Sequence, residues 1–405
     1  MADLPSEVDI AIVGAGPAGL AAATELRRLQ AGRVLVIERE TEAGGVPRFC
    51  GHSPYGFREF GRPMLGPAYA RALVKRAKAA RVEIATGLTV TGLSDGPRLS
   101  VTSDDGAAEI SARLVLLTTG IRETTRAGRL IGGTKPGGVL TTGGLQGFVY
   151  GAGLRPFRRP VILGTELVAF SAVLTCLHAG IRPVAMVEPG PRITARAPSG
   201  LLPRLLGIPL HLGTDVAAIE GREQVDAVVL CENGKERRLA ADGVIVTGRF
   251  RPEATLVRLA GLAYDPATGG PDVDEFGRTS DPQIFAAGNL LRPVETAGWC
   301  WAEGRAVARA MARALGEGLP PPASRRVTRA GALAYVLPQR LAGGAAPALD
   351  TLQLRASSAA AGRLSLTVDG HETAGRPLRA LPERRLVLPL PAATGAPKVS
   401  LDTTP

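Results

Sequence analysis

Three glycines and one glutamate near the N-terminus have the types and spacing of a dinucleotide-binding turn. Gly14, Gly16 and Gly19 form the pattern G-x-G-x-x-G directly after the apolar run 8–13, and Glu38 ends the next apolar run, 33–37. The first glycine permits a tight turn, the second lets the backbone approach a pyrophosphate, and the third lets helix and strand pack closely. A following helix offers free N–H groups to phosphates, and the carboxylate accepts the ribose hydroxyls. The spacing predicts a dinucleotide site, which a nicotinamide cofactor could also use.

A second turn of this kind carries a glutamate where a glycine is expected. Residues 164–169 read G-T-E-L-V-A, so Glu166 occupies the position that should admit a pyrophosphate. A carboxylate there fills the space and repels phosphate. The pattern favours loss of ordinary NAD(P) binding, although Glu188, at the next strand end, is still able to hold a ribose. Without NAD(P)H, the first cofactor must be reduced by an organic substrate or a partner subunit.

The elements that must position these turns alternate between strand and helix. Strand 8–13, a helix after the first turn and strand 33–37 form one βαβ unit, and residues 161–250 repeat the pattern less faithfully. Segment 279–315 again reads as strand, glycine turn and long helix, which we expect to return to the first unit. Beyond three consecutive prolines, the runs 352–355, 363–368 and 385–390 alternate like short strands and precede a loose Pro/Gly/Thr tail.

We therefore expect an α/β fold with two nested Rossmann-like dinucleotide-binding domains, each with a parallel sheet, and a small C-terminal β appendage. The expected FAD-binding domain comprises residues 1–120 and 279–317, and the degenerate NAD(P)-binding-like domain comprises residues 121–278. A linker at 318–326 leads to the β-rich region 327–405.

Composition excludes several classes of function. The net charge is +11, but the basic residues are scattered and form no run of five or six, so nucleic-acid binding is not expected. The four cysteines are far apart and form no C-x-x-C pair, so neither a metal site nor a vicinal dithiol is expected. The apolar stretch 161–181 contains Glu166 and His178, which argues against an integral membrane segment. With no export signal visible, we expect a cytoplasmic protein.

Further motifs resemble one family of flavoproteins. Glu38-Arg39, Gly44-Gly45, Thr119-Gly120 and the late motif I-F-A-A-G-N at 284–289 are together similar to the glutathione-reductase-like superfamily, whose members have two dinucleotide-binding domains. The resemblance covers roughly residues 8–315 and implies FAD at the first turn. It also implies that the late motif contacts the ribityl chain and pyrophosphate, with Asn289 in place of the family's aspartate. A helix starting at residues 294–298 would aim its N-terminus at the flavin N1 and C2 carbonyl, unless Glu295 and Thr296 simply cap it.

The turn and the resemblance together define an expected set of cofactor contacts. These residues are Gly14, Gly16, Pro17, Ala18, Gly19, Glu38, Arg39, Gly44, Gly45, Val46, Val90, Thr119, Gly120, Gly288, Asn289, Glu295, Thr296 and Ala297.

Segments 44–52, 66–70 and 136–143 are similar to a narrower branch that lacks a redox disulfide. That branch includes flavin subunits of opine and hydroxyproline dehydrogenases, hydrogen cyanide synthase, and oxidoreductases associated with anaerobic glycerol-3-phosphate dehydrogenase. The resemblance implies a second flavoprotein or an iron-sulfur protein as a partner.

Few side chains are candidates for catalysis, because a flavin itself accepts hydride and electrons. Cys50 and His52 lie in the loop expected beside the flavin, as a reactive thiol and a proton acceptor, or as a buried inert cysteine and a loop hydrogen-bonder. Trp299 and Trp301 either cover the flavin ring or only pack.

The favoured function is a flavin subunit that oxidises a small amine, amino-acid-like or hydroxy compound and passes electrons to a partner. The alternatives are an NAD(P)H-dependent reductase of a carrier protein or quinone, and a non-catalytic flavin-bearing assembly subunit.

Overall fold

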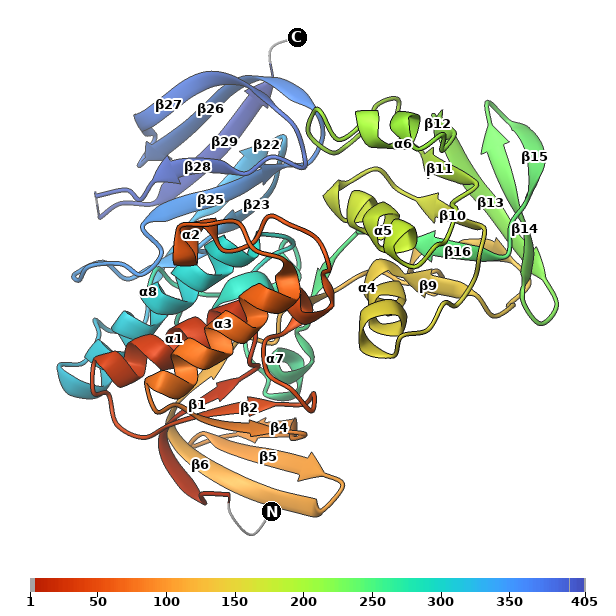
Figure 1. The fold of residues 1–405 in the computed structure, drawn as a ribbon. Coiled ribbons are helices and arrows are strands. Elements are labelled where there is room, and N and C mark those ends of the chain that lie inside the picture. Colours follow the sequence, from red (N-terminus) through yellow and green to blue (C-terminus); the bar gives the residue numbers. More distant parts are fainter. Residues whose placement is uncertain (1–3, 393, 404–405) are drawn as a thin grey trace.

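A computed structural model describes residues 4–392 and 394–403, which form two nested α/β units followed by a β region (Figure 1). The first unit is built on a seven-stranded sheet with the order β3-β2-β1-β6-β5-β4, and β20 also pairs with β6. Its strands are β1 (Glu7–Val13), β2 (Val34–Glu38), β3 (Glu83–Thr86), β4 (Thr89–Ser94), β5 (Arg98–Ser103), β6 (Gly106–Leu117) and β20 (Ile284–Ala286). Strands β1, β2, β3, β6 and β20 are joined by parallel pairings, as expected for a dinucleotide-binding unit.

Three helices pack together over the same apolar core of this sheet. They are α1 (Pro17–Arg28), α3 (Gly66–Ala79) and α8 (Ala297–Gly316). The sequence predicted a helix near residues 69–80, and α3 begins earlier because Pro67, which lacks an N–H donor, is tolerated in a first turn. The expected strand, glycine turn and long helix of segment 279–315 are confirmed, and they place α8 beside α1.

The second unit has a five-stranded parallel sheet with the order β12-β11-β10-β16-β9. Its elements are β9 (Val139–Thr141), α4 (Thr142–Gln146), β10 (Pro160–Leu163), α5 (Leu167–His178), β11 (Ala185–Glu188), α6 (Leu201–Leu205), β12 (Leu210–Leu212) and β16 (Gly243–Val246). Beside it lies a four-stranded sheet of β8 (Gly132–Gly133), β13 (Thr214–Gly221), β14 (Val225–Glu232) and β15 (Lys235–Ala240). Two short antiparallel strands, β7 (Ile121–Arg122) and β17 (Arg251–Pro252), connect the two units.

The chain returns to the first unit earlier than the expected residue 279. Ala254, Leu256 and Val257, around the short helix α7 (Thr255–Leu259), are buried in the first unit's core together with Val273. Their apolar side chains are covered by the sheet of the first unit, a long-range contact that the local sequence pattern does not reveal. We therefore propose to move this boundary to about residue 252, where β17 ends.

The C-terminal region consists of two small sheets around a separate apolar core. One contains β22 (Thr328–Gly331), β29 (Pro397–Thr403), β26 (Ala360–Val368) and β27 (His371–Ala380), and the other contains β23 (Leu333–Leu337), β25 (Thr351–Ala356) and β28 (Leu386–Pro389). The expectation of a loose tail is wrong for its described part, because β29 pairs with both β22 and β26 and buries Val399 and Leu401.

This β region is packed on the first unit rather than tethered to it. Leu337 and Leu349 belong to the first unit's core, and the Gln339 side chain donates to Asp265 at 2.9 Å and accepts from the backbone N–H of Val273 at 3.1 Å. The expected linker is also held, because Arg278 donates to the backbone carbonyl of Pro320 at 2.8 Å.

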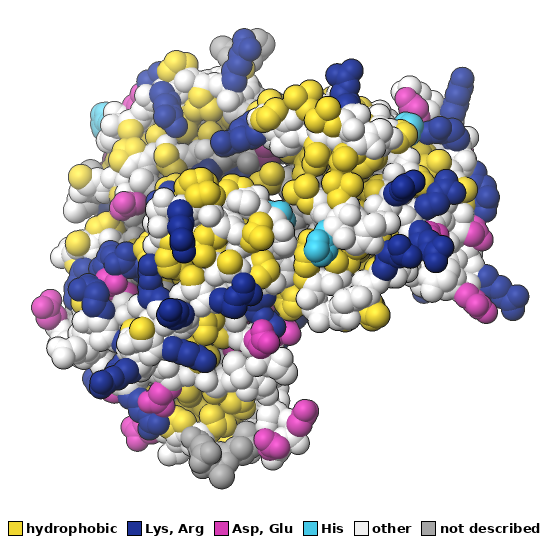
Figure 2. Space-filling view, in the orientation of Figure 1, with side chains coloured by type: hydrophobic (Ala, Val, Ile, Leu, Met, Phe, Trp, Pro, Cys, Tyr) yellow, Lys and Arg dark blue, Asp and Glu magenta, His cyan; other side chains and the backbone are white. Residues whose placement is uncertain are grey.

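The surface agrees with the scattered charge of the sequence. Figure 2 shows lysines and arginines distributed over this face without one dominant patch. Within the described part of the chain, no helix combines the length and apolar character needed to cross a membrane.

Candidate flavin site

The phosphate turn joins β1 to α1, and its three glycines have different steric reasons. A Cβ at Gly19 would lie 2.0 Å from the backbone oxygen of Gly14, so this position must lack a side chain for helix and strand to pack. Gly14 has a φ of +104°, which favours glycine. At Gly16, by contrast, a Cβ would meet no protein atom within 4 Å. The open space beside Gly16 is what a bound pyrophosphate requires, so the turn fits the cofactor.

Glu38 lies at the end of β2 with its carboxylate directed at this turn. One carboxylate oxygen accepts the backbone N–H of Ala15 at 2.8 Å, and the other accepts that of Glu40 at 3.0 Å. The residue is 8% exposed. Each carboxylate oxygen has a second lone pair, so ribose hydroxyls can still be accepted. The geometry supports the predicted role of Glu38.

The double glycine of the following loop contacts the phosphate turn directly. The N–H of Gly44 donates to the carbonyl of Ala15 at 2.9 Å, and a Cβ at Gly45 would lie 2.8 Å from the Cα of Gly16. The loop therefore closes over the turn only because these positions lack side chains. Residues 39 and 46, on either side of the double glycine, are both exposed.

Three other expected contacts occupy structural positions in the first unit. Val90, on β4, is half-buried against the core. The Thr119 hydroxyl donates to the carbonyl of Glu253 at 2.8 Å, and the carbonyl of Gly120 accepts the N–H of Glu253 at 2.8 Å. These two residues hold the crossing between the units, and their contact with the cofactor stays a prediction.

The start of α8 is held by Asn289. The side chain of Asn289 accepts the N–H of Glu295 at 2.7 Å and donates to the carbonyl of the same residue at 3.1 Å. The N-cap Thr296 makes no side-chain hydrogen bond to the helix, so the capping alternative is not observed for Thr296. Free N–H groups with a partial positive charge therefore remain at this helix end, as the predicted flavin contact requires.

Sequence reasoning missed a buried ion pair beneath this site. Arg292 and Glu303 are 1% and 6% exposed, and they form two hydrogen bonds of 2.8 and 3.0 Å. Glu303 also accepts the N–H of Gly288 at 2.8 Å, and Arg292 donates to the carbonyl of Gly288 at 3.1 Å. The pair thus supports the glycine turn before α8. Its only local signal is the position of Glu303 on the buried face of α8.

In the second unit, Glu166 fills the place that a pyrophosphate would need. One oxygen of its carboxylate accepts the hydroxyl of Thr247 at 2.6 Å, and the other would lie 2.4 Å from a Cβ at Gly164. Burial raises the pKa of this carboxyl. Glu188 is engaged as well, because it accepts the Thr165 hydroxyl at 2.6 Å and the N–H of Gly190 at 3.0 Å.

Cys50 lies where the flavin-side loop meets α4. Its thiol is 5% exposed and lies 3.7 Å from the Gln146 side-chain oxygen, and burial raises its pKa. The thiol is therefore protonated near neutral pH, which favours the inert alternative. Burial lowers the pKa of the half-buried His52, so this imidazole is neutral and able to accept a proton. The catalytic role of either residue stays a prediction.

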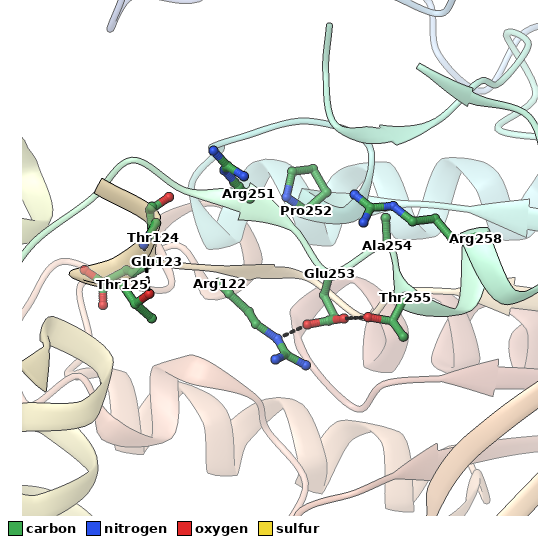
Figure 3. Close-up of a pocket in the computed structure, with 11 residues that line it drawn as sticks. Arg122, Glu123, Thr124, Thr125, Arg251, Pro252, Glu253, Ala254, Thr255 and Arg258 are labelled. Carbon is green, nitrogen blue, oxygen red and sulfur yellow. Dashed lines mark hydrogen bonds and ion pairs between the residues drawn. The ribbon is translucent and has the colours of Figure 1, made fainter. Parts of the chain in front are cut away.

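A separate cavity of about 300 Å³ lies at the crossing strands β7 and β17 (Figure 3). Arg122 pairs there with Glu253, whose other oxygen accepts the Thr255 hydroxyl at 2.5 Å. Glu123 accepts the N–H groups of Gly143 and Gly248 in the second unit, at 2.7 and 3.0 Å. The cavity belongs to the connection between the units, because no residue of the phosphate turn lines it.

Each of the four cysteines has a free thiol. Among the described residues, no group of three His, Cys, Asp or Glu side chains is placed to hold a metal ion.

Comparisons with known proteins agree with this geometry. The sequence matches the family model described as pyridine nucleotide-disulphide oxidoreductase over residues 158–311, and a model of an NAD(P)-binding Rossmann-like domain over residues 12–49. In structure, the chain is similar to T. acidophilum thioredoxin reductase, with a TM-score of 0.63 and 20% identity over 76% of this chain and 98% of the other. L-proline dehydrogenase from P. horikoshii has a TM-score of 0.57 and 22% identity over 76% and 56%.

Curated relatives include reductase components and subunits. The ferredoxin reductase component of chlorobenzene dioxygenase from Cupriavidus sp. is 30% identical over 69% of this chain and 66% of its own length. An opine oxidase subunit of Agrobacterium tumefaciens is 27% identical over 71% and 62%, and the hydrogen cyanide synthase subunit HcnB of Pseudomonas aeruginosa is 29% identical over 69% and 65%. The matched segment thus spans slightly less than two thirds of each relative.

The nested Rossmann-like units, the fitted phosphate turn and these matches lead to one conclusion. The chain is an FAD-dependent oxidoreductase that belongs to the pyridine nucleotide-disulphide oxidoreductase family, within the superfamily of flavoproteins with two dinucleotide-binding domains.

Proposed function

We propose that the chain is the flavin subunit of a dehydrogenase that oxidises an amine, amino-acid-like or hydroxy compound and passes the electrons to a partner protein. When bound, FAD supplies the hydride- and electron-accepting chemistry. The chain's own residues bind the cofactor through the Gly16 turn and Glu38, and present the N-terminus of α8 to it. The observation that carries the proposal is Glu166 in the second unit.

Glu166 opposes a nicotinamide cofactor in two ways. Its carboxylate occupies the space beside Gly164 and Gly248, and a Cβ at Gly248 would lie only 2.0 Å from its oxygen. If ionised, it would also repel a pyrophosphate, since like charges about 4 Å apart cost about 1 kcal/mol in water and more near a protein surface. A reductant other than NAD(P)H is thereby favoured.

The partner is argued from the relatives. The opine oxidase and hydrogen cyanide synthase relatives are named as subunits, and the chlorobenzene dioxygenase relative is named as a component. This supports a multi-protein system for the present chain, with a second flavoprotein or an iron-sulfur protein as the proposed partner.

A second candidate is an NAD(P)H-dependent reductase of a carrier protein or quinone. The relatives that favour it are the ferredoxin reductase component from Cupriavidus and a ferredoxin–NADP reductase from Saccharopolyspora erythraea, which is 28% identical over 72% of this chain and 87% of its own length. Glu188 also remains at the end of β11, where a ribose would bind.

Anaerobic reduction of the purified holoprotein separates these candidates. The visible band of the bound flavin is followed while NADH, NADPH and a panel of amines, amino acids and hydroxy acids are added one at a time. We expect a member of the panel to bleach the flavin and low concentrations of NADH and NADPH not to do so. Prompt bleaching by either nicotinamide would overturn the proposal in favour of the reductase.

Two variants test the role of Glu166 directly. Glu166→Gly removes both the charge and the bulk, and we expect flavin reduction by NADH to accelerate by roughly tenfold or more. Glu166→Gln keeps the bulk and removes only the charge, so its gain should be smaller. Equal NADH rates in the wild type and both variants, measured by stopped flow, would show that Glu166 is not the barrier.

A further inference from the structure

Three arginines lie close together between the C-terminal β region and the start of α8. They are Arg292 in the loop before α8, Arg355 on β25 and Arg385 just before β28. The Nε atoms of all three, and Nη1 of Arg385, are buried and have no hydrogen-bond partner among the described residues. Buried donors without an acceptor are unfavourable, so native structures usually supply a partner from protein, solvent or ligand.

The ion pairs of this cluster leave Arg385 uncompensated. Arg292 pairs with Glu303 at 2.8 Å, and Arg355 pairs with Glu295 at 3.2 Å. No carboxylate of the described chain lies within ion-pair distance of Arg385. Burial lowers the pKa of the Arg385 guanidinium, against the attraction of the nearby Glu295. A positive charge thus remains beside the first turn of α8.

Arg385 is held in place by Trp299. Its guanidinium carbon lies 4.1 Å from the centre of the Trp299 ring, and that of Arg58, from α2 (Phe57–Phe60), lies 4.0 Å from the same ring. Trp299 is in the first turn of α8 and is 40% exposed, so the stack reaches the surface. Stacking fixes the plane of a guanidinium while leaving its edge free for an acceptor.

Arg355 positions the segment that precedes α8. It donates to the carbonyl of Val294 at 2.9 Å and to the carboxylate of Glu295 at 3.2 Å, while Gln353 donates to Glu303 at 3.4 Å. The C-terminal β region therefore fixes the geometry of the helix end that the flavin is expected to meet. It also brings Arg385 to the same place.

We propose that Arg385, stacked on Trp299, binds the carboxylate of a small organic acid beside the start of α8, with Arg58 adding positive charge from the other face of the ring. A guanidinium matches a carboxylate with two parallel hydrogen bonds, and the N-terminus of α8 adds a favourable field. The inference rests on the proposed function in one respect, since the acid would be the compound whose oxidation reduces the flavin. The C-terminal β region then supplies substrate binding to the flavin unit.

Tryptophan fluorescence of the holoprotein tests the binding step without turnover. The chain has only two tryptophans, so Trp299→Phe and Trp301→Phe assign the signal. Acetate and lactate are titrated at constant ionic strength against chloride. We expect a saturable change that persists in Trp301→Phe, disappears in Trp299→Phe and is absent with chloride alone.

Arginine variants identify the binding group. Arg385→Gln should weaken lactate binding roughly ten- to a hundredfold, the usual effect of losing a charged hydrogen-bonding partner. Arg384→Gln is the matched control, because the adjacent Arg384 is more exposed and lies 3.9 Å from Glu383, and its affinity should equal the wild type. Arg385→Lys keeps the charge without the planar fork and should bind with intermediate affinity. Should the glutamine variant not fold, the lysine variant alone decides the comparison.

The outcomes separate this inference from the proposed function. Lack of a carboxylate response in the wild type, or equal affinity in the wild type and the Arg385 variants, would overturn the inference even if the panel reduces the flavin. If carboxylates bind in an Arg385-dependent way but no panel compound reduces the flavin, the binding site stands and the dehydrogenase proposal fails.

Discussion

At the scale of single residues, the two glycines at the start of α1 are needed for opposite reasons. Gly19 is required by the protein itself, because a Cβ would lie 2.0 Å from a backbone oxygen. Gly16 is not, since a Cβ there would meet no protein atom within 4 Å, and its backbone has an ordinary extended conformation. The space beside Gly16 therefore serves the cofactor.

This difference predicts different consequences for the same substitution. Gly16→Ala should leave the free energy of unfolding of the cofactor-free protein nearly unchanged and weaken FAD binding by roughly tenfold or more, because a methyl group enters the pyrophosphate space. Gly19→Ala should instead destabilise the cofactor-free protein by about 1–3 kcal/mol through overpacking. Urea unfolding and FAD titration of the two variants check this, and equal stability losses would contradict it.

At the scale of elements, α1 and α8 are joined by close backbone contact and by charge. A Cβ at Gly304 would lie 2.2 Å from the carbonyl oxygen of Ala18, so the helices touch. Glu25 on α1 is 3% exposed and pairs with Arg305 and Arg309 on α8, at 2.9 and 3.0 Å. The contact fixes α8, and with it the helix end that faces the flavin.

The pKa of Glu25 predicts how this contact depends on pH. Burial alone would raise that pKa, but hydrogen bonds from Arg28, Arg305 and Arg309 lower it to about 2. Because the folded-state pKa lies below the unfolded one, the stabilisation is complete above about pH 4.5 and is lost as the pH falls toward 2. Glu25→Gln should therefore lower the free energy of unfolding by about 1–3 kcal/mol at neutral pH, and this difference should shrink below pH 4.5.

Urea unfolding at a series of pH values measures this dependence. Glu83→Gln serves as the control, since the Arg33–Glu83 pair is exposed on both sides and should contribute at most about 1 kcal/mol. A Glu25→Gln difference that stays constant from neutral to acidic pH would show that the ion pairs are not its source.

At the scale of the whole molecule, the C-terminal β region shares its core with the flavin unit. Leu337 is fully buried and belongs to the first unit's core although it lies on β23 of the C-terminal region. Residues 254–273 join the same core from the other side of the crossing strands. The flavin unit is thus completed by segments from both later parts of the chain.

Removing this shared contact should weaken both parts together. We expect Leu337→Ala to destabilise the holoprotein by about 2–5 kcal/mol, with flavin release and tryptophan fluorescence changing in the same transition. Val387→Ala, at a site 37% exposed in the same region, should have little effect. Flavin release at an unchanged temperature in Leu337→Ala would show that the two parts unfold independently.

The sequence alone determined the features that depend on neighbours along the chain. The turn from Gly14 to Gly19, Glu38 at the next strand end and Glu166 in the second turn were all predicted, because steric demands within one βαβ unit act over short separations. The strands expected near 352–355, 363–368 and 385–390 were likewise confirmed, since each alternates locally.

Only the tertiary structure decided what meets across long separations. Arg385 reaches Trp299 and Arg355 reaches Glu295, although 86 and 60 residues separate these pairs along the chain, and β29 forms by pairing with β22 and β26. No local periodicity marks such contacts, because an arginine or a Pro-rich segment has the same neighbours in sequence whether it is exposed or buried. Packing of the β region on the flavin unit brings them together, and it places a buried positive charge beside α8.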